Sequence, residues 1–126
     1  MAFKLEIPKT GSKPCVLIDE ERGYLKLEGE SFHDNIIEFF APIRQWLSKH
    51  LVSDFTELTF DCSLTYFNSS TAKLLLNILI EMDKAAARGK KIKVNWITSE
   101  DNDIIIECGE DFSEGIESLT FNMIIE

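Results

Sequence analysis

The segment of residues 55–97 constrains the fold of this chain more than any other. Its first part, residues 55–62, alternates apolar and polar side chains, which predicts a strand. A largely apolar helix is predicted from about Ser69 to Arg88, and alternation returns over residues 91–98. A strand, a helix and a second strand of this length form a crossover. We therefore expect the two strands to be parallel and their connection to be right-handed.

The other elements follow from the same two periodicities. Further strands are predicted over residues 3–7, 15–19, 24–29 and 119–125, and further helices over residues 34–51 and 100–113. The second and third strands are expected to form a hairpin around Gly23. Asp34 is expected to cap its helix, and Pro42 to kink that helix or to split off its first turns. Within residues 100–113, Ile104-Ile105-Ile106 fits a strand equally well.

The resulting order of elements is βββ-α-β-α-β-α-β, which belongs to the α/β class. We expect one mixed sheet of five or six strands with three helices packed on it. The chain has 126 residues and 44% hydrophobic content, which is enough for a single domain over residues 1–126 with its own core.

Composition excludes several classes of protein. No apolar run approaches the roughly 18–20 residues that cross a bilayer, and the first residues lack the pattern of a signal peptide. We therefore expect a cytoplasmic protein without a membrane partner. Cys15, Cys62 and Cys108 are odd in number and far apart, which favours buried free thiols over a disulfide framework or a zinc site.

The net charge of −9 is placed unevenly along the chain. All 13 lysines and arginines lie at or before Lys93, whereas nine of the 22 acidic residues lie in residues 94–126 with no base among them. Nucleic acid is a poor partner for such a surface, because phosphate attracts lysine and arginine. The acidic segment fits either a solvated face or a site for a basic protein partner.

The junction between residues 55–62 and the long helix carries a row of polar side chains, Asn68-Ser69-Ser70-Thr71. These residues are preferred helix caps, which is a sufficient structural explanation. The same position also favours a phosphate, because the free N–H groups and the dipole of a helix N-terminus attract negative charge. Lys73 lies three or four residues after the two serines, where it could contact such a phosphate.

Motifs for catalysis and for cofactor or metal binding are not found in the sequence. There is no glycine-rich nucleotide motif, and His33 and His50 are not spaced as a metal pair. We expect both histidines to be surface or partly buried polar residues without a catalytic role. Asp61, placed by the prediction at the carboxyl end of a central strand, is a weak candidate for chemistry. A small enzyme that uses Asp61 and the neighbouring hydroxyls is the least favoured hypothesis.

The segment Leu64-Thr65-Tyr66-Phe67-Asn68-Ser69-Ser70-Thr71-Ala72-Lys73 closely resembles the signature of the SiaC-type regulatory phosphoproteins. These small bacterial proteins are related in concept to the STAS-domain antagonists of anti-sigma factors. The likeness extends along nearly the whole chain and implies a STAS-like fold. It also implies that Ser69, rather than Ser70, accepts a phosphate from a cognate kinase and loses it to a phosphatase of the PP2C type.

The same resemblance implies a switch in partner binding rather than an enzyme, without a cofactor or a metal. The unphosphorylated form would bind and activate a target such as a diguanylate cyclase. The residues expected to contact partners are Tyr66, Phe67, Asn68, Ser70, Thr71 and Lys73. An alternative is a STAS-like antagonist that sequesters an anti-sigma factor or kinase. The chain departs from the STAS pattern Asp-Ser-Ser/Thr-Gly, because Asn68 replaces the aspartate and no glycine follows the hydroxyls.

Overall fold

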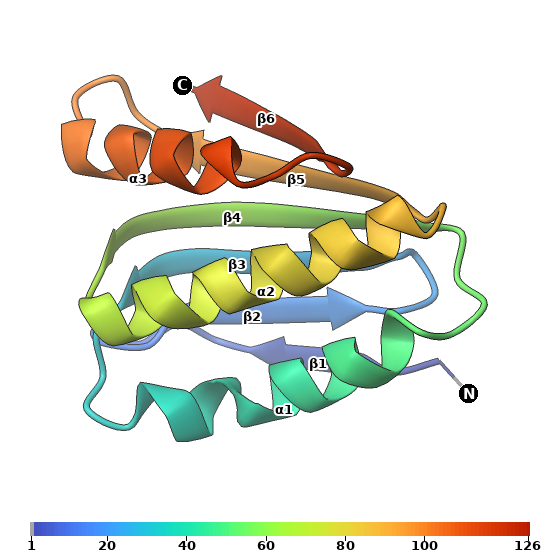
Figure 1. Ribbon diagram of the computed structural model, residues 1–126. Helices are drawn as coiled ribbons and strands as arrows, with labels where there is room; N and C mark the ends of the chain where they lie inside the picture. The colour runs from blue at the N-terminus through green and yellow to red at the C-terminus, as the bar shows by residue number, and fades with distance from the viewer. Residues whose placement is uncertain (1) are drawn as a thin grey trace.

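The computed structural model describes residues 2–126 as six strands and three helices (Figure 1). The strands are β1 (Lys4–Ile7), β2 (Cys15–Asp19), β3 (Tyr24–Ser31), β4 (Glu57–Phe67), β5 (Lys91–Thr98) and β6 (Thr120–Ile125). The helices are α1 (Ile36–His50), α2 (Ser69–Ala87) and α3 (Asp103–Glu114). The predicted order of elements and the α/β class are therefore confirmed.

The six strands form one mixed sheet in the order β1-β2-β3-β4-β5-β6. β1, β2 and β3 pair antiparallel, and the turn between β2 and β3 places Gly23 at a φ of 62°. From β3 to β6 all pairs are parallel, as expected for residues 55–97. Each crossover steps in the same direction along the sheet, so right-handed connections place α1, α2 and α3 on one face (Figure 1).

The hydrophobic core lies between this helical layer and the sheet. Alternate residues of the central strands point into it, among them Leu25, Phe60 and Trp96, each at most 1% exposed. The intervening residues lie on the opposite face, which no described helix covers, and they are mainly polar. None of the three helices in residues 2–126 has the length and hydropathy needed to cross a membrane.

Several predicted boundaries need correction. β4 continues to Phe67, five residues beyond the predicted end of this strand, because its last part pairs with the end of β3. α1 begins at Ile36 with Asn35, not Asp34, at its N-cap. Pro42 lies inside α1 without splitting it, and the buried Phe40 and Ile43 on either side secure that part of the helix to the core.

α3 resolves the ambiguity of Ile104-Ile105-Ile106 in favour of a helix. Asn102 caps it, with its Oδ1 accepting a hydrogen bond from the Ile105 backbone N–H at 3.3 Å. Only Ile105 of the three isoleucines is buried, as one face of a helix requires. All three cysteines are free thiols, with Cys62 buried and Cys15 and Cys108 half-buried.

Candidate phosphorylation and docking site

The start of α2 is organised by Asn68. Its backbone is extended, and its side-chain Oδ1 accepts a hydrogen bond from the Thr71 N–H at 3.0 Å. This is the geometry of an N-cap, which satisfies one of the free N–H groups at the helix end. Asn68 is thereby committed to the helix, and Ser69 and Ser70 become its first two residues.

The three hydroxyls after Asn68 have different surroundings. Ser69 and Ser70 are exposed, whereas Thr71 is fully buried. The Thr71 hydroxyl lies 2.8 Å from the Ser31 Oγ and donates to the Ser31 carbonyl oxygen at 3.1 Å. Thr71 therefore connects α2 to the end of β3. The expectation that Thr71 contacts a partner is wrong, because its side chain points into the core.

Replacement of Thr71 by valine is expected to lower the free energy of unfolding by about 1–3 kcal/mol. Valine keeps the shape of threonine but leaves the buried Ser31 hydroxyl without its side-chain partner. Urea unfolding measures the loss, and Thr71→Ser, which retains the hydroxyl, serves as the matched control. A Thr71→Val protein as stable as the unmodified one would show that the hydrogen bonds of this hydroxyl make no net contribution to stability.

The electrostatics around Ser69 favour an added anion. The first turn of α2 contains no acidic residue, although aspartate and glutamate are the usual residues at this end of a helix. The exposed Lys73 lies one turn further along. A phosphate on Ser69 or Ser70 would therefore meet free N–H groups, the positive end of the dipole and a lysine without a repelling carboxylate in that turn.

Helical periodicity distinguishes the two exposed serines. Ser69 lies on the same side of α2 as Leu76 and Ile80, both 39% exposed, whereas Ser70 lies on the side of Asn77 and Glu81. Leu76 and Ile80 form an exposed apolar stripe on this helix. Ser69 is thus in line with an apolar stripe that begins about two turns further along α2, and Ser70 is in line with polar residues at the same spacing.

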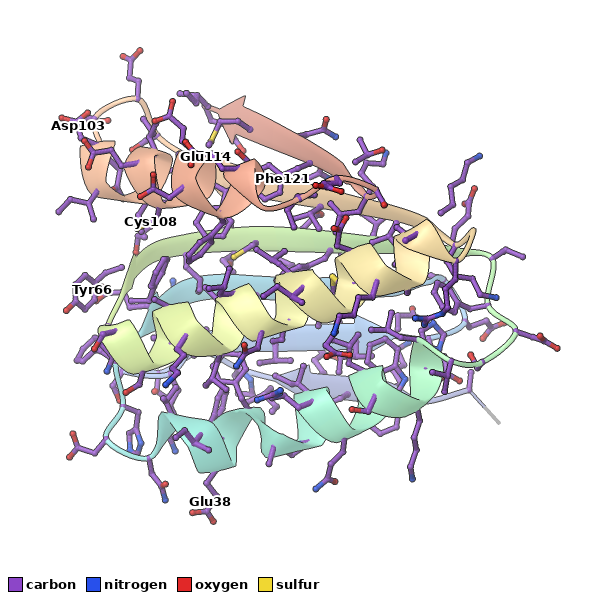
Figure 2. All side chains as sticks on the ribbon, viewed as in Figure 1. Glu38, Tyr66, Asp103, Cys108, Glu114 and Phe121 are labelled. Atoms are coloured by element: carbon purple, nitrogen blue, oxygen red, sulfur yellow. The ribbon has the colours of Figure 1, made fainter. Side chains whose placement is uncertain are left out.

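Two aromatic residues before the helix are placed differently. Tyr66 is 50% exposed at the end of β4, and its ring meets the Phe32 ring edge-on at 5.7 Å (Figure 2). Phe67 is half-buried, with its ring 6.1 Å from that of Trp96. Tyr66 is available to a partner, while Phe67 mainly packs against Trp96. Phe32 was missed because it belongs to no periodic segment, and only its contact with Tyr66 reveals it.

Asp61 does not belong to this site. It lies in the middle of β4 on the face away from the helices. Phe67, the end of that strand, is six positions further along, or roughly 20 Å away. Its carboxylate accepts hydrogen bonds from the Tyr24 hydroxyl at 2.7 Å and the Asn95 amide at 2.8 Å. Partial burial and this carboxylate raise the pKa of Tyr24 to about 12. Asp61 is thus a sheet residue, and the hydroxyls do not share a site with it.

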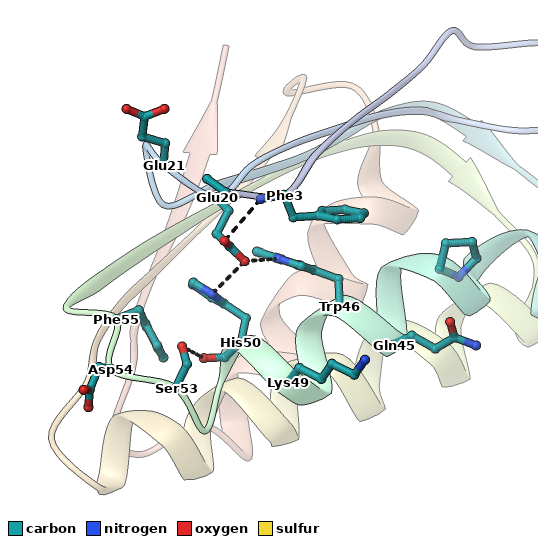
Figure 3. Close-up of a pocket in the computed structure, with 12 residues that line it drawn as sticks. Phe3, Glu20, Glu21, Gln45, Trp46, Lys49, His50, Ser53, Asp54 and Phe55 are labelled. Carbon is teal, nitrogen blue, oxygen red and sulfur yellow. Dashed lines mark hydrogen bonds and ion pairs between the residues drawn. The ribbon is translucent and has the colours of Figure 1, made fainter.

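A cavity of about 780 Å³ lies where α1 ends, opposite the end where α2 begins (Figures 1 and 3). His50 is buried there, contrary to its prediction as a surface or partly buried residue. Its ring stacks between Trp46 and Phe55 at centroid distances of 4.7 and 4.6 Å. The Glu20 carboxylate accepts a hydrogen bond from the Trp46 indole at 2.8 Å and lies 3.5 Å from His50 Nδ1. Both faces of the His50 ring are thus covered by the rings of Trp46 and Phe55.

Burial lowers the pKa of His50 below its usual value of 6.5, against the opposing effect of Glu20. The unfolded chain therefore binds this proton more readily than the folded one, so His50 favours folding above about pH 6.5 and disfavours it as the pH falls. We expect lower stability at about pH 5.5 than at about pH 7.5. The difference should shrink in His50→Phe, whose ring retains the stacking. Urea midpoints at both pH values measure it, and identical pH dependence in the two proteins would contradict the assignment.

Solved structures with the same fold come from Pseudomonas aeruginosa. The crystal structure of apo-SiaC superposes with a TM-score of 0.88 at 29% identity, covering 97% of this chain and 98% of that one. In the crystal structure of the diguanylate cyclase SiaD in complex with its activator SiaC, the matching chain has a TM-score of 0.91 at 29% identity, covering 97% and 99%. The architecture is thus that of a small regulatory protein.

Sequence comparison defines the family. Residues 7–126 match the family described as SiaC family regulatory phosphoprotein. An uncharacterised protein of Pseudomonas aeruginosa (strain UCBPP-PA14) is 30% identical over 110 residues, which is 87% of each chain. The chain belongs to the SiaC family of regulatory phosphoproteins.

Proposed function

We propose that this protein controls a diguanylate cyclase by binding it, and that a phosphate on Ser69 prevents the binding. The unphosphorylated form would be the activator. The observation that carries this proposal is the position of Ser69, an exposed hydroxyl in the first turn of α2, on the side of the helix where Leu76 and Ile80 are exposed further along. The complex of Pseudomonas aeruginosa SiaC with the cyclase SiaD, whose activator it is, supports the choice of target.

The docking surface would consist of Tyr66, Leu76 and Ile80 around Ser69, with Ser70 and Lys73 at its rim. Aromatic side chains at interfaces often contribute most of the binding energy, and Tyr66 is already 50% exposed to solvent in the free protein. Asn68 and Phe67 would act through packing, since one caps α2 and the other contacts Trp96. The protein itself would perform no chemistry.

A phosphate would act on this surface through desolvation. It adds about 1.5–2 negative charges at neutral pH. In the free protein the helix N-terminus and Lys73 stabilise that charge, whereas an apolar partner surface would remove its water without supplying a counter-ion. The modification would therefore stabilise the unbound form. A cognate kinase and a phosphatase of the PP2C type would set the balance between the two forms.

Peptide mapping by mass spectrometry of the protein from its host tests the modification. We expect one phosphate, on Ser69, and its removal by a PP2C-type phosphatase. Calorimetry with a purified diguanylate cyclase from the same organism then compares the modified and unmodified forms. Equal affinities of the two forms would reject the switch, and a phosphate on Ser70 alone would reassign the acceptor.

A further inference from the structure

β6 forms one edge of the sheet, with β5 on one side and none of the described residues pairing on the other. The Glu126 N–H donates to the Thr98 carbonyl oxygen of β5 at 2.9 Å. Because hydrogen-bonding direction alternates along a strand, the N–H and C=O groups of Phe121, Met123 and Ile125 point away from β5. Three donors and three acceptors thus face outward in one row.

This edge lacks the features that normally prevent pairing with another strand. Edge strands are usually protected by charged residues, prolines or bulges. The opposite edge, β1, carries Lys4 and Glu6, whereas β6 reads Thr-Phe-Asn-Met-Ile-Ile, with no charge and no proline. Its register with β5 is continuous, and Ile125 is 50% exposed. The backbone of β6 is therefore ready to accept a further strand.

The charge around β6 selects which strand can approach. α3 covers β5 and β6, and its exposed stripe of acids follows helical spacing, as the outward positions of Asp103 and Glu114 illustrate (Figures 1 and 2). The stripe consists of Asp103, Glu107, Glu110, Asp111 and Glu114. A second copy pairing through β6 would bring two such stripes together, whereas a lysine- or arginine-bearing strand would be attracted. Charge thus disfavours self-association and favours a basic partner.

We propose that the free edge of β6 binds an extended, basic segment of a partner protein, which adds a seventh strand to the sheet. Main-chain hydrogen bonds to Phe121, Met123 and Ile125 hold the segment, and the solvent-facing acids of α3 attract its basic side chains through their long-range field. β6 lies two strands away from β4, at whose end Ser69 stands. The inference is therefore independent of the phosphorylation switch and describes a second surface of the molecule.

Selection from a display library of random 12-residue peptides tests the inference with the full chain as bait. We expect the enriched peptides to alternate β-branched with lysine or arginine residues. Ile125→Pro removes an outward N–H that does not pair with β5. It should weaken the binding of these peptides roughly tenfold or more. Ile124→Thr, whose N–H points toward β5, is the matched control and should retain binding. Glu110→Gln with Glu114→Gln should weaken binding and reduce its dependence on salt.

Amide hydrogen exchange supplies a readout that needs no variant. An enriched peptide should slow exchange at Met123 and Ile125 and leave the already paired Asn122 and Ile124 unchanged. Enriched peptides without basic residues, or exchange unchanged along β6, would overturn the proposal. Dimerisation abolished by Ile125→Pro would overturn it in favour of a second copy. Ser69→Asp should not alter peptide binding and Ile125→Pro should not alter cyclase binding, so failure of one idea leaves the other standing.

Discussion

Replacement of Ser69 by aspartate is expected to weaken binding of a diguanylate cyclase by roughly a hundredfold or more, because a charge buried against an apolar partner costs several kcal/mol. Aspartate introduces this charge where phosphorylation would, on the side of α2 that exposes the apolar Leu76 and Ile80. Folding should be retained, since an acidic residue in the first turn of a helix stabilises it slightly, by about 0.5 kcal/mol. Isothermal calorimetry gives the affinity, and thermal unfolding shows that the variant is folded.

Ser70→Asp is the matched control for this experiment. It places the same charge on the same helical turn, but on the side of the polar Asn77 and Glu81. We expect it to weaken binding less than Ser69→Asp, and Ser69→Ala to bind as the unmodified protein does. Comparable losses of affinity in both aspartate variants would show that any charge near the N-terminus of α2 weakens binding, so that Ser69 has no special position. Undiminished binding by Ser69→Asp would contradict the docking surface itself.

Replacement of Gly109 by alanine is expected to lower the free energy of unfolding by about 1–3 kcal/mol, because it overpacks the contact between α3 and the sheet. A Cβ at this buried position would lie 2.5 Å from Trp96 Cδ1 and 2.6 Å from Met123 Cε. The methionine can move, but the Trp96 ring is 1% exposed and its indole N–H donates to the Ile105 carbonyl oxygen at 2.9 Å. α3 must therefore move away from Trp96.

Gly115→Ala, at the C-cap of α3, provides the comparison. A Cβ at Gly115 meets no atom within 4 Å, and its φ of −90° suits any residue. We expect this change to alter stability by less than about 0.5 kcal/mol. Urea unfolding of the two variants separates overpacking from a general effect of replacing glycine by alanine. A Gly109→Ala protein as stable as Gly115→Ala would show that α3 is loosely held.

Local sequence patterns were sufficient to predict the elements and their connections. The alternation at residues 91–98 and the apolar periodicity of α2 arise from the side-chain repeats of a strand and a helix, which need no tertiary information. The parallel pairing of β4 with β5 followed from the crossover between them. The position of α2 after a capping Asn68 likewise depends on neighbouring residues alone.

Tertiary structure decided what those elements present to a partner. Ser69 and Thr71 are both hydroxyl residues of one helical turn, yet Thr71 is buried because Ser31, forty residues earlier, receives its hydrogen bond. His50 is buried because Trp46 and Phe55 enclose its ring. Asp61 lies in mid-strand because β4 continues along β3 as far as Phe67. Most of these contacts join residues far apart in the chain, so no local period records them, and the polar groups of the junction could be sorted only once the strands and helices were assembled.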